Sequence, residues 1–396
     1  MRYIGNKTRL LGFIQRAAES VGLTGGSMHD AFSGTASVGR AFKALGWRVA
    51  SSDIMTYSYV FQRAYVVTQR SPSFADLRSG VSDVRTTLRS TRFREALSKR
   101  RARTGRAGVA PEPGAALAAV AEYLSSWIEP EAGFMTRHYS PLGGRMYFTE
   151  ENAGRIDAVR RRLHEWRAEG LMGDDEFFIL LAALIEAADR VANTAGVYAA
   201  YIKSWQPNAL RPLTLTPLSP VRGPRGAQAH QADAASVAAA LGPVDLLYVD
   251  PPYNARQYAG YYHVPEIIAR GWFDDTPAIA GKTGLLAVRN QRSDWCSARK
   301  VEGALAGLLE ATRARHILVS YNSEGLLPED AMRSILGRHS PDQHVRRFTH
   351  TYRRYRADAD HSRRRYREGE LREILYYAKL SGGSVKGKQK ADSRKQ

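Results

Sequence analysis

A short run near residue 250 carries the side chains that are best suited to chemistry. Residues 246–249 form a continuous apolar run, typical of a buried strand, and Asp250, Pro251, Pro252 and Tyr253 follow at once. Pro251 has no N–H to donate to a sheet, so the strand should end before it. The sequence therefore predicts a loop at the carboxyl end of this strand, where ligands bind in open α/β sheets.

The groups of this loop suit a planar molecule that carries an amino group. The Asp250 carboxylate and the Pro251 carbonyl oxygen can accept hydrogen bonds from the amine, and the Tyr253 ring can stack on a heterocycle. The amine of a nucleobase is a poor nucleophile because its lone pair is delocalised into the ring. Two acceptors would localise that lone pair, so orientation and electrostatics would supply most of the acceleration. A base in a duplex would have to flip out to reach such a loop.

A second candidate site precedes this loop along the chain. A short strand should end near Asp30, and Phe32, Ser33 and Gly34 begin a glycine-rich turn that leads into a helix. The next strand should end at Asp53, which completes a βαβ unit. Such units bind nucleotide-like cofactors and place the second acid on the ribose hydroxyls.

The turn itself narrows the choice of cofactor. It lacks the lysine–serine pair of a phosphate-binding loop, and Ala36 stands where a dinucleotide site would need glycine. A cofactor with an adenosine ribose and no phosphate, such as S-adenosylmethionine, fits this pattern better than a dinucleotide does. A glycine turn with a purely structural role is the alternative.

The surrounding pattern predicts an α/β frame with a mostly helical insertion. After the catalytic loop, we expect helices at residues 258–270, 299–314 and 326–336 and strands at residues 316–321 and 371–380.

Between the two sites, residues 61–225 read as helices, including residues 152–170 and 174–191, and end in a proline-rich connector. We expect a catalytic domain from residues 1–60 and 226–380. Residues 381–396 form a basic tail that we expect to be disordered.

Composition and charge limit the classes of partner and the compartment that we expect for the protein. The chain has 58 Lys and Arg against 39 Asp and Glu, and the net charge of +19 favours a polyanionic partner, although solvated surface charge is the alternative. A single cysteine, Cys296, fits a reducing compartment. No apolar stretch near 18 residues and no signal core are present, so we expect a cytoplasmic protein away from membranes. We expect no metal site, because His138, His263 and His316 have no acid or cysteine at ligand spacing.

Residues 345–367 interleave arginines with aromatic side chains, and they include Arg353, Arg354 and Arg356. This mixture is expected of a segment that binds phosphates and stacks on bases. A solvated charged loop is the alternative. We take these three arginines as candidate DNA contacts.

The order of the motifs resembles the Dam-like group of DNA adenine-N6 methyltransferases, in which the cofactor half precedes the catalytic half. Residues 3–7 resemble the N-terminal cofactor motif, residues 30–39 the glycine motif and residues 250–253 the catalytic tetrapeptide. The resemblance covers residues 1–60 and 230–380, and it is to type II restriction-modification or phage-type members. It implies a Rossmann-like, S-adenosylmethionine-dependent methyltransferase fold with a mixed, mostly parallel sheet.

The resemblance also implies roles for single residues. Tyr3 and Lys7 would line the methionine side of the cofactor, and Asp233 resembles the acid that contacts the cofactor adenine. Arg256 and Asn322 lie in stretches that are similar to those of the same enzymes, and we take them as candidate DNA contacts. Asp30 and residues 32–34 would form the cofactor turn, and Asp53 would bind the ribose. The helical insertion corresponds by position to a target-recognition region.

These inferences predict an enzyme that methylates the N6 amine of a flipped adenine in double-stranded DNA. Asp250 and Pro251 would polarise the amine and Tyr253 would stack on the base. A restriction-modification or phage-defence role would add a cognate nuclease or defence protein as a partner. The alternatives are an inactive DNA-binding subunit of a defence system, or methylation of RNA adenine or DNA cytosine.

Overall fold

The structure is a computed structural model of the chain. It describes residues 1–2, 5–104, 114–287, 291–353 and 370–381; within these, residues 99–104, 352–353 and 370–371 are described by their backbone alone. The predicted disorder of the basic tail falls on residues 382–396, which lie outside the described part.

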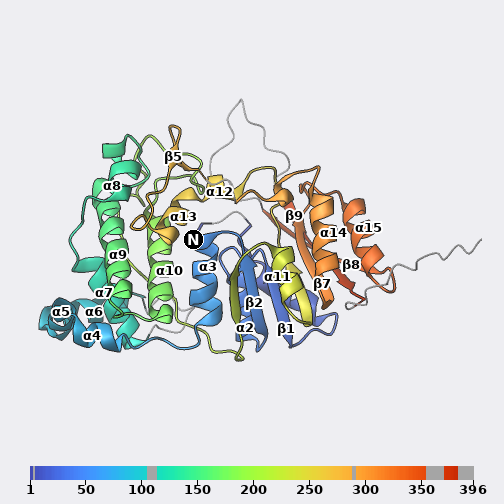
Figure 1. Cartoon of the computed structure of the whole chain (residues 1–396), viewed down its shortest axis with the longest axis horizontal. Helices are drawn as coiled ribbons and strands as arrows, with labels where there is room; N and C mark the ends of the chain where they lie inside the picture. Colours follow the sequence, from blue (N-terminus) through green and yellow to red (C-terminus); the bar gives the residue numbers. More distant parts are fainter. Residues whose placement is uncertain (3–4, 105–113, 288–290, 354–369, 382–396) are drawn as a thin grey trace, which may run out of the picture.

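A seven-stranded sheet forms the centre of the molecule (Figure 1), with the order β3-β2-β1-β4-β7-β9-β8. The neighbours from β3 to β7 pair in parallel, whereas β9 runs antiparallel to both β7 and β8. The expected α/β fold with a mixed, mostly parallel sheet is therefore confirmed. The strands are β1 (Ser27–Ala31), β2 (Arg48–Asp53), β3 (Gln228–Gln231), β4 (Val244–Val249), β7 (Ala314–Asn322), β8 (Val345–Arg353) and β9 (Glu370–Lys379).

Strand β4 is apolar on both faces because both faces of the sheet are covered. Leu247 and Val249 point into one buried cluster, and Leu246 and Tyr248 point into another. The first cluster is completed by α11 (Ala234–Ala240), α14 (Val301–Ala311) and α15 (Glu329–His339). The second is completed by α1 (Leu11–Glu19), α2 (Ser37–Ala44) and α3 (Thr56–Phe61). A continuous apolar run is what such a doubly covered strand requires.

The chain between β2 and β3 contains helices and no strand among its described residues. These helices form the part of the molecule on the left of Figure 1, beside the sheet. The chain then reaches β3 through a connector without helix or strand. The helices between β2 and β3 are α3, η1 (Gln62–Val67), α4 (Ala75–Gly80), α5 (Ser82–Arg89), α6 (Thr91–Thr104), α7 (Ala115–Ser126), α8 (Phe134–Tyr139), η3 (Pro141–Gly143), α9 (Glu150–Ala168) and α10 (Asp174–Val191). The domain bounds stay a prediction.

Two features after the catalytic loop differ from the expected elements. The helix expected at residues 258–270 is broken into α12 (Tyr258–Tyr261) and α13 (His263–Arg270), because Tyr262 leaves the helical region with φ −123° and ψ 29°. A small hairpin of β5 (Ile279–Ala280) and β6 (Leu285–Leu286) and the turn η4 (Asp294–Cys296) follow. The hydrophobic patterns at these places are too short to predict the helix break, the hairpin or the turn.

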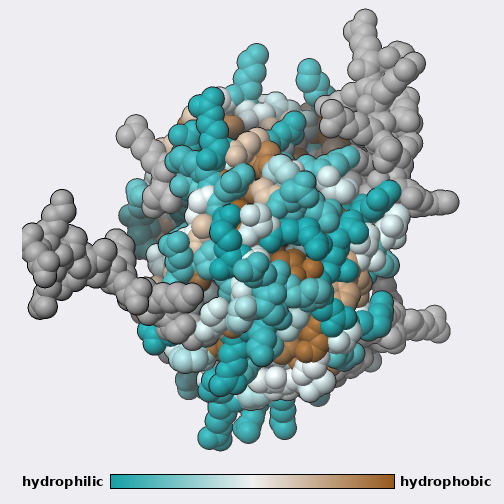
Figure 2. Space-filling model, turned by 90° about the vertical axis from the view of Figure 1, so that its right-hand side faces the viewer, coloured by the Kyte–Doolittle hydropathy of each residue, from teal (hydrophilic) through white to brown (hydrophobic). Residues whose placement is uncertain are grey.

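The surface at the α15 end of the molecule is mostly hydrophilic (Figure 2). Arg333 and Arg338 of α15 are exposed there. Among the described helices, none has the length and apolar character that a membrane crossing requires.

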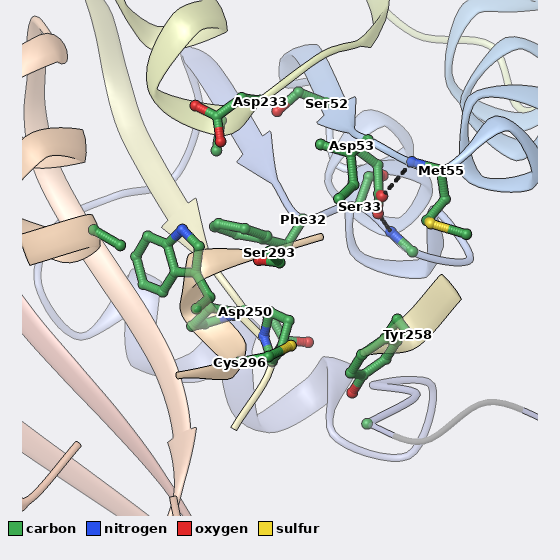
Figure 3. Close-up of a pocket in the computed structure, with 18 of the residues that line it drawn as sticks. Phe32, Ser33, Ser52, Asp53, Met55, Asp233, Asp250, Tyr258, Ser293 and Cys296 are labelled. Atoms are coloured by element: carbon green, nitrogen blue, oxygen red, sulfur yellow. Dashed lines mark hydrogen bonds between the residues drawn. The ribbon is translucent and has the colours of Figure 1, made fainter. Parts of the chain in front are cut away.

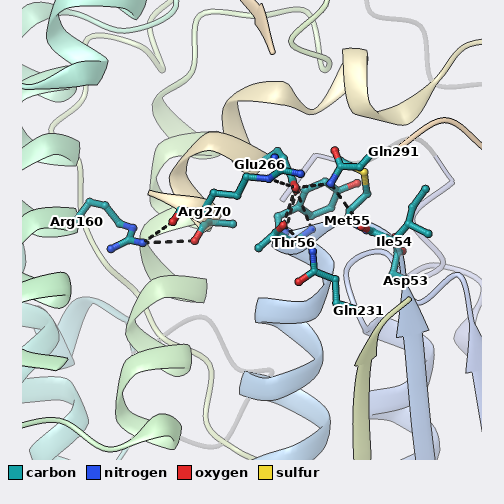
Figure 4. Close-up of polar contacts among 11 residues, drawn as sticks. Asp53, Ile54, Met55, Thr56, Arg160, Gln231, Glu266, Arg270 and Gln291 are labelled. Carbon is teal, nitrogen blue, oxygen red and sulfur yellow. Dashed lines mark hydrogen bonds and ion pairs between the residues drawn. The ribbon is translucent and has the colours of Figure 1, made fainter. Parts of the chain in front are cut away.

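Glu266 of α13 joins this helix to the first turn of α3 (Figure 4). It is fully buried and accepts hydrogen bonds from the backbone N–H groups of Thr56 and Tyr57, both at 3.2 Å. It also accepts from Arg270 Nε at 2.8 Å and from Gln291 Nε2 at 2.6 Å. The two N–H groups belong to the first turn of α3, so this one carboxylate caps α3 directly after the end of β2.

We expect Glu266→Gln to lower the free energy of unfolding by roughly 2–4 kcal/mol, because a donor amide would replace one acceptor oxygen inside a buried network. Urea unfolding monitored by tryptophan fluorescence measures this loss. Glu165→Gln is the matched control, because Glu165 pairs with Arg161 at the surface and should cost less than about 0.5 kcal/mol. Equal losses in the two variants would contradict the role given to Glu266.

Candidate active site

A cavity of about 490 Å³ opens at the carboxyl ends of β1, β2 and β4 (Figure 3). Its lining joins residues that are far apart in the sequence: the N-terminal segment, three strand ends, η4 and α14. Tyr3 lies outside the described residues. The other residues predicted for the cofactor and the catalytic loop all line the cavity: Lys7, Asp30, Phe32, Ser33, Gly34, Asp53, Asp233, Asp250, Pro251, Pro252 and Tyr253.

Asp30, near the end of β1, holds the glycine turn in shape. Its Oδ2 accepts from Ser33 Oγ at 3.0 Å and from the N–H of Gly39 at 3.1 Å. Burial raises the pKa of Asp30 to about 7, although the hydrogen bond from Ser33 acts in the opposite direction. Gly39 is required for the close approach, because a Cβ there would lie 2.8 Å from Asp30 Oδ2 and 2.9 Å from Ser51 Oγ.

The turn runs through the left-handed region of backbone conformation. Phe32, Gly34 and Ala36 have φ values of 66°, 52° and 56°. For a residue with a Cβ this conformation costs on the order of 1–2 kcal/mol. The Ala36 methyl is fully buried, which returns about 0.8 kcal/mol. The position expected to require glycine therefore accepts alanine at a small net cost.

Asp53 at the end of β2 connects two strand ends. Its Oδ2 accepts from the N–H of Gly34 and its Oδ1 from the N–H of Met55, both at 2.9 Å. Burial raises the pKa of Asp53, and the two backbone hydrogen bonds oppose that rise. Because each carboxylate oxygen has two lone-pair sites, Asp53 keeps capacity for hydroxyl donors from a ligand.

Asp233 has a structural use as well as a place on the cavity wall. It is the N-cap of α11, and its Oδ1 accepts from the N–H groups of Ala235 at 2.9 Å and Ser236 at 3.3 Å. Both hydrogen bonds go to the same oxygen. The side chain is exposed toward the cavity mouth, where Figure 3 shows it beside Ser52.

The catalytic loop is held from two sides. Lys7 Nζ lies 3.0 Å from Asp250 Oδ1, and the Gly5 backbone packs against the Tyr253 ring, where a Cβ would lie 3.4 Å from it. From the other side, the N–H of Leu326 donates to the Tyr253 carbonyl at 3.2 Å. Burial raises the pKa of Asp250 to about 7, although Lys7 lowers it.

Sequence reasoning missed three parts of the site. Trp295 of η4 lines the cavity and packs edge-on against Phe32, with ring centroids 4.9 Å apart. The small residues Gly303 and Gly307 of α14 line the same wall. Glu373 of β9 contacts Lys7 at 2.5 Å. Only Glu373 carried a usable signal, because a lone acid inside an apolar strand demands a buried partner.

Two of the candidate DNA contacts, Arg256 and Asn322, lie outside the cavity lining. Arg256 Nη1 donates to Tyr261 Oη at 2.6 Å, and Asn322 Oδ1 accepts from the N–H of Glu324 at 2.7 Å. Arg353 is described by its backbone alone, and Arg354 and Arg356 lie outside the described residues. Their contacts with DNA stay predictions.

Comparison with known proteins gives one family and several relatives. Residues 3–335 match the D12 class N6 adenine-specific DNA methyltransferases. The chain is 36% identical to the type II methyltransferase M.FokI of Planomicrobium okeanokoites over 95% of its own length. It is 33% identical to the type II methyltransferase M.NlaIII of Neisseria lactamica over 92% of its length, and 29% identical to the modification methylase StsI of Streptococcus sanguinis over 95%.

The relatives differ in length. The chain spans 52% of M.FokI and 51% of StsI, but 95% of M.NlaIII. No solved structure matches the chain.

We expect Gly39→Ala to lower the free energy of unfolding by roughly 1–3 kcal/mol, because the new methyl group would force Asp30 and Ser51 apart. Thermal unfolding measures this loss as a lower Tm. Gly242→Ala is the matched control, because a Cβ at Gly242 meets nothing within 4 Å. A Tm for Gly39→Ala that matches the control would mean that the turn does not need this close approach.

Proposed function

Because the chain belongs to the family of D12 class N6 adenine-specific DNA methyltransferases, we propose that it methylates the N6 amine of adenine in double-stranded DNA with S-adenosylmethionine as methyl donor. One observation carries the proposal: the loop of Asp250 to Tyr253 and the turn around Asp53 open into the same cavity. An amine acceptor and a ribose acceptor thus face one cavity, as transfer between two bound molecules requires.

The cavity fits the proposed cofactor. Its volume of about 490 Å³ lies within the range of small-molecule sites. Asp53 offers a carboxylate to the ribose hydroxyls, Asp233 stands at the mouth for an adenine amine, and Phe32 and Trp295 supply apolar wall. Bound S-adenosylmethionine would supply an electrophilic methyl group on a sulfonium.

The catalytic loop would prepare the adenine amine for attack. Lys7 occupies Asp250 Oδ1, so we assign Oδ2 and the Pro251 carbonyl oxygen to the two N6 hydrogens. The Tyr253 ring would stack on the flipped base. Transfer of the methyl group from the sulfonium to N6 would leave a neutral thioether and a cationic N6, which would then lose one proton. Asp250, with its pKa of about 7, can accept that proton near neutral pH.

The charge of the chain and the names of its relatives support the DNA substrate and the biological role. The net charge of +19 favours a polyanion. M.FokI and M.NlaIII are named as type II methyltransferases, and on that basis we propose a role in restriction-modification with a cognate nuclease as partner. The presence of Asp250, a charged acceptor in the cavity, favours this function over that of an inactive DNA-binding subunit.

We expect Asp250→Ala to reduce methyl transfer at least 1000-fold, about 4 kcal/mol, because the variant loses both the amine acceptor and the proton acceptor. Transfer of a labelled methyl group from S-adenosylmethionine to plasmid DNA, followed by nucleoside mass analysis, measures the rate and identifies the product. DNA affinity should change less than threefold.

Asp76→Ala is the matched control, since Asp76 is an exposed acid in the first turn of α4. N6-methyladenine in DNA is the expected product. Methylated cytosine, methylation of RNA alone, or an Asp250→Ala rate equal to that of the control would refute the proposed function.

We expect the arginines of residues 345–367 to contact DNA phosphates. Replacing Arg353, Arg354 and Arg356 with Ala should then flatten the slope of log affinity against log salt by about 0.9 for each phosphate that the variant no longer binds. Fluorescence anisotropy at several salt concentrations measures the slope. The control replaces Arg313, Arg333 and Arg338, which are exposed on or beside α14 and α15; a slope that changes equally in both triple variants would assign the effect to net charge alone.

A further inference from the structure

Three charged side chains meet beneath the catalytic loop. Lys7 Nζ lies 2.5 Å from Glu373 Oε1 and 3.0 Å from Asp250 Oδ1. The side chains of Lys7 and Glu373 are only 3% and 2% exposed. Ser320 Oγ donates to the same oxygen of Glu373 at 2.5 Å. The three charges come from the N-terminal segment, from the loop after β4 and from β9.

One ammonium is thus shared between two carboxylates. Burial alone would lower the pKa of Lys7, but Asp250 and Glu373 raise it well above its usual range, so Lys7 stays charged. For Asp250, burial raises the pKa, Lys7 lowers it, and Glu373 raises it again. Glu373 therefore opposes the effect of Lys7 on the pKa of Asp250.

The position of Glu373 affects how the Asp250 carboxylate can bind the amine. An ammonium that paired with Asp250 alone would neutralise the carboxylate that must accept from the amine. An ammonium anchored by Glu373 is instead held at Oδ1, which leaves Oδ2 free to accept a hydrogen bond from the amine. A buried ammonium requires a counter-charge, and the reacting carboxylate already supplies one. Glu373 is a second counter-charge, which contacts Lys7 and Ser320.

We propose that Glu373 is a positioning residue, which orients the Asp250 carboxylate through Lys7 and places its own negative charge near it. This role rests on the proposed methyl transfer. The other titratable groups near these three residues are Asp30 of β1, Tyr248 of β4, Tyr253 of the loop and His350, the cross-strand neighbour on β8.

Two substitutions should move the acidic limb of the pH–rate profile in opposite directions. Glu373→Gln removes a negative charge near Asp250, so the limb should shift to lower pH by at least half a unit. Lys7→Met removes the positive charge, so the limb should shift to higher pH by one unit or more. Single-turnover rates with saturating S-adenosylmethionine and DNA, from pH 5 to 9, measure both shifts.

The rate on the alkaline plateau tests whether Glu373 acts through Lys7. Glu373→Gln should lower it about tenfold in the native background, because Lys7 loses its anchor and the Asp250 carboxylate its orientation. In the Lys7→Met background the same substitution should change the plateau less than twofold. An unmoved limb in Glu373→Gln, or an equal plateau loss in both backgrounds, would reduce Glu373 to a structural counter-ion and overturn the proposal.

Glu19→Gln is the matched control for charge, because Glu19 is an exposed acid at the end of α1. It should leave both limb and plateau unchanged, and an equal limb shift there would also overturn the proposal. Should Glu373→Gln fail to fold, Lys7→Met/Glu373→Gln leaves fewer unpaired buried charges and carries the test. Its acidic limb should lie below that of Lys7→Met, and identical limbs would contradict any effect of Glu373 on Asp250.

A second readout separates this role from the proposed function. The carboxyl carbon of Asp250, labelled with ¹³C and assigned through Asp250→Asn, reports its own titration without substrate. It should titrate lower in Glu373→Gln and higher in Lys7→Met. Absence of methyl transfer by the native protein would refute the proposed function, whereas unchanged carboxyl titrations would refute the role of Glu373.

Discussion

The burial of negative charge at one edge of the sheet is the constraint on which the rest of the site depends. Asp30, Asp53 and Asp250 lie at or next to the carboxyl ends of three parallel strands, and all line one cavity. Desolvation and mutual repulsion disfavour their charged forms. Backbone N–H groups offset this cost for Asp30 and Asp53, and Lys7 does so for Asp250. Each of the three acids therefore requires a neighbouring turn or segment that brings these compensating groups to it.

Residues of the N-terminal segment contact both the helices between β2 and β3 and the catalytic loop. The backbone N–H of Arg2 donates to Asp189 of α10 at 2.6 Å, and its guanidinium donates to the Ala192 carbonyl at 3.0 Å. Lys7, a few residues later, reaches the catalytic loop. Glu266 links α13 to the first turn of α3, directly after the end of β2.

Left-handed backbone and carboxyl groups with raised pKa values both occur beside the cavity. The cofactor turn uses left-handed backbone at Phe32 and Ala36, and Asp30 and Asp250 both have raised pKa values. These features cost stability, and they lie beside the cavity; two further residues with left-handed backbone, Phe74 and Gln343, lie elsewhere. Such a distribution is expected where a site is shaped for a ligand that supplies the missing donors.

The sequence by itself determined the features whose cause is local. The apolar run of β4, the stop at Pro251 and the spacing of Asp30 and Asp53 follow from burial, from a missing N–H and from the length of a βαβ unit. The fold class and the acids at the strand ends of the cavity could therefore be predicted. Tertiary structure alone decided the partners of the charges. Lys7 and Glu373 are 366 positions apart, and they meet because β9 enters the sheet antiparallel beside β7. Trp295 reaches Phe32 through a turn without any motif, and Tyr262 breaks a helix that its periodicity favours. Periodicity reports which residues are buried, but the pairing of distant strands decides what they are buried against.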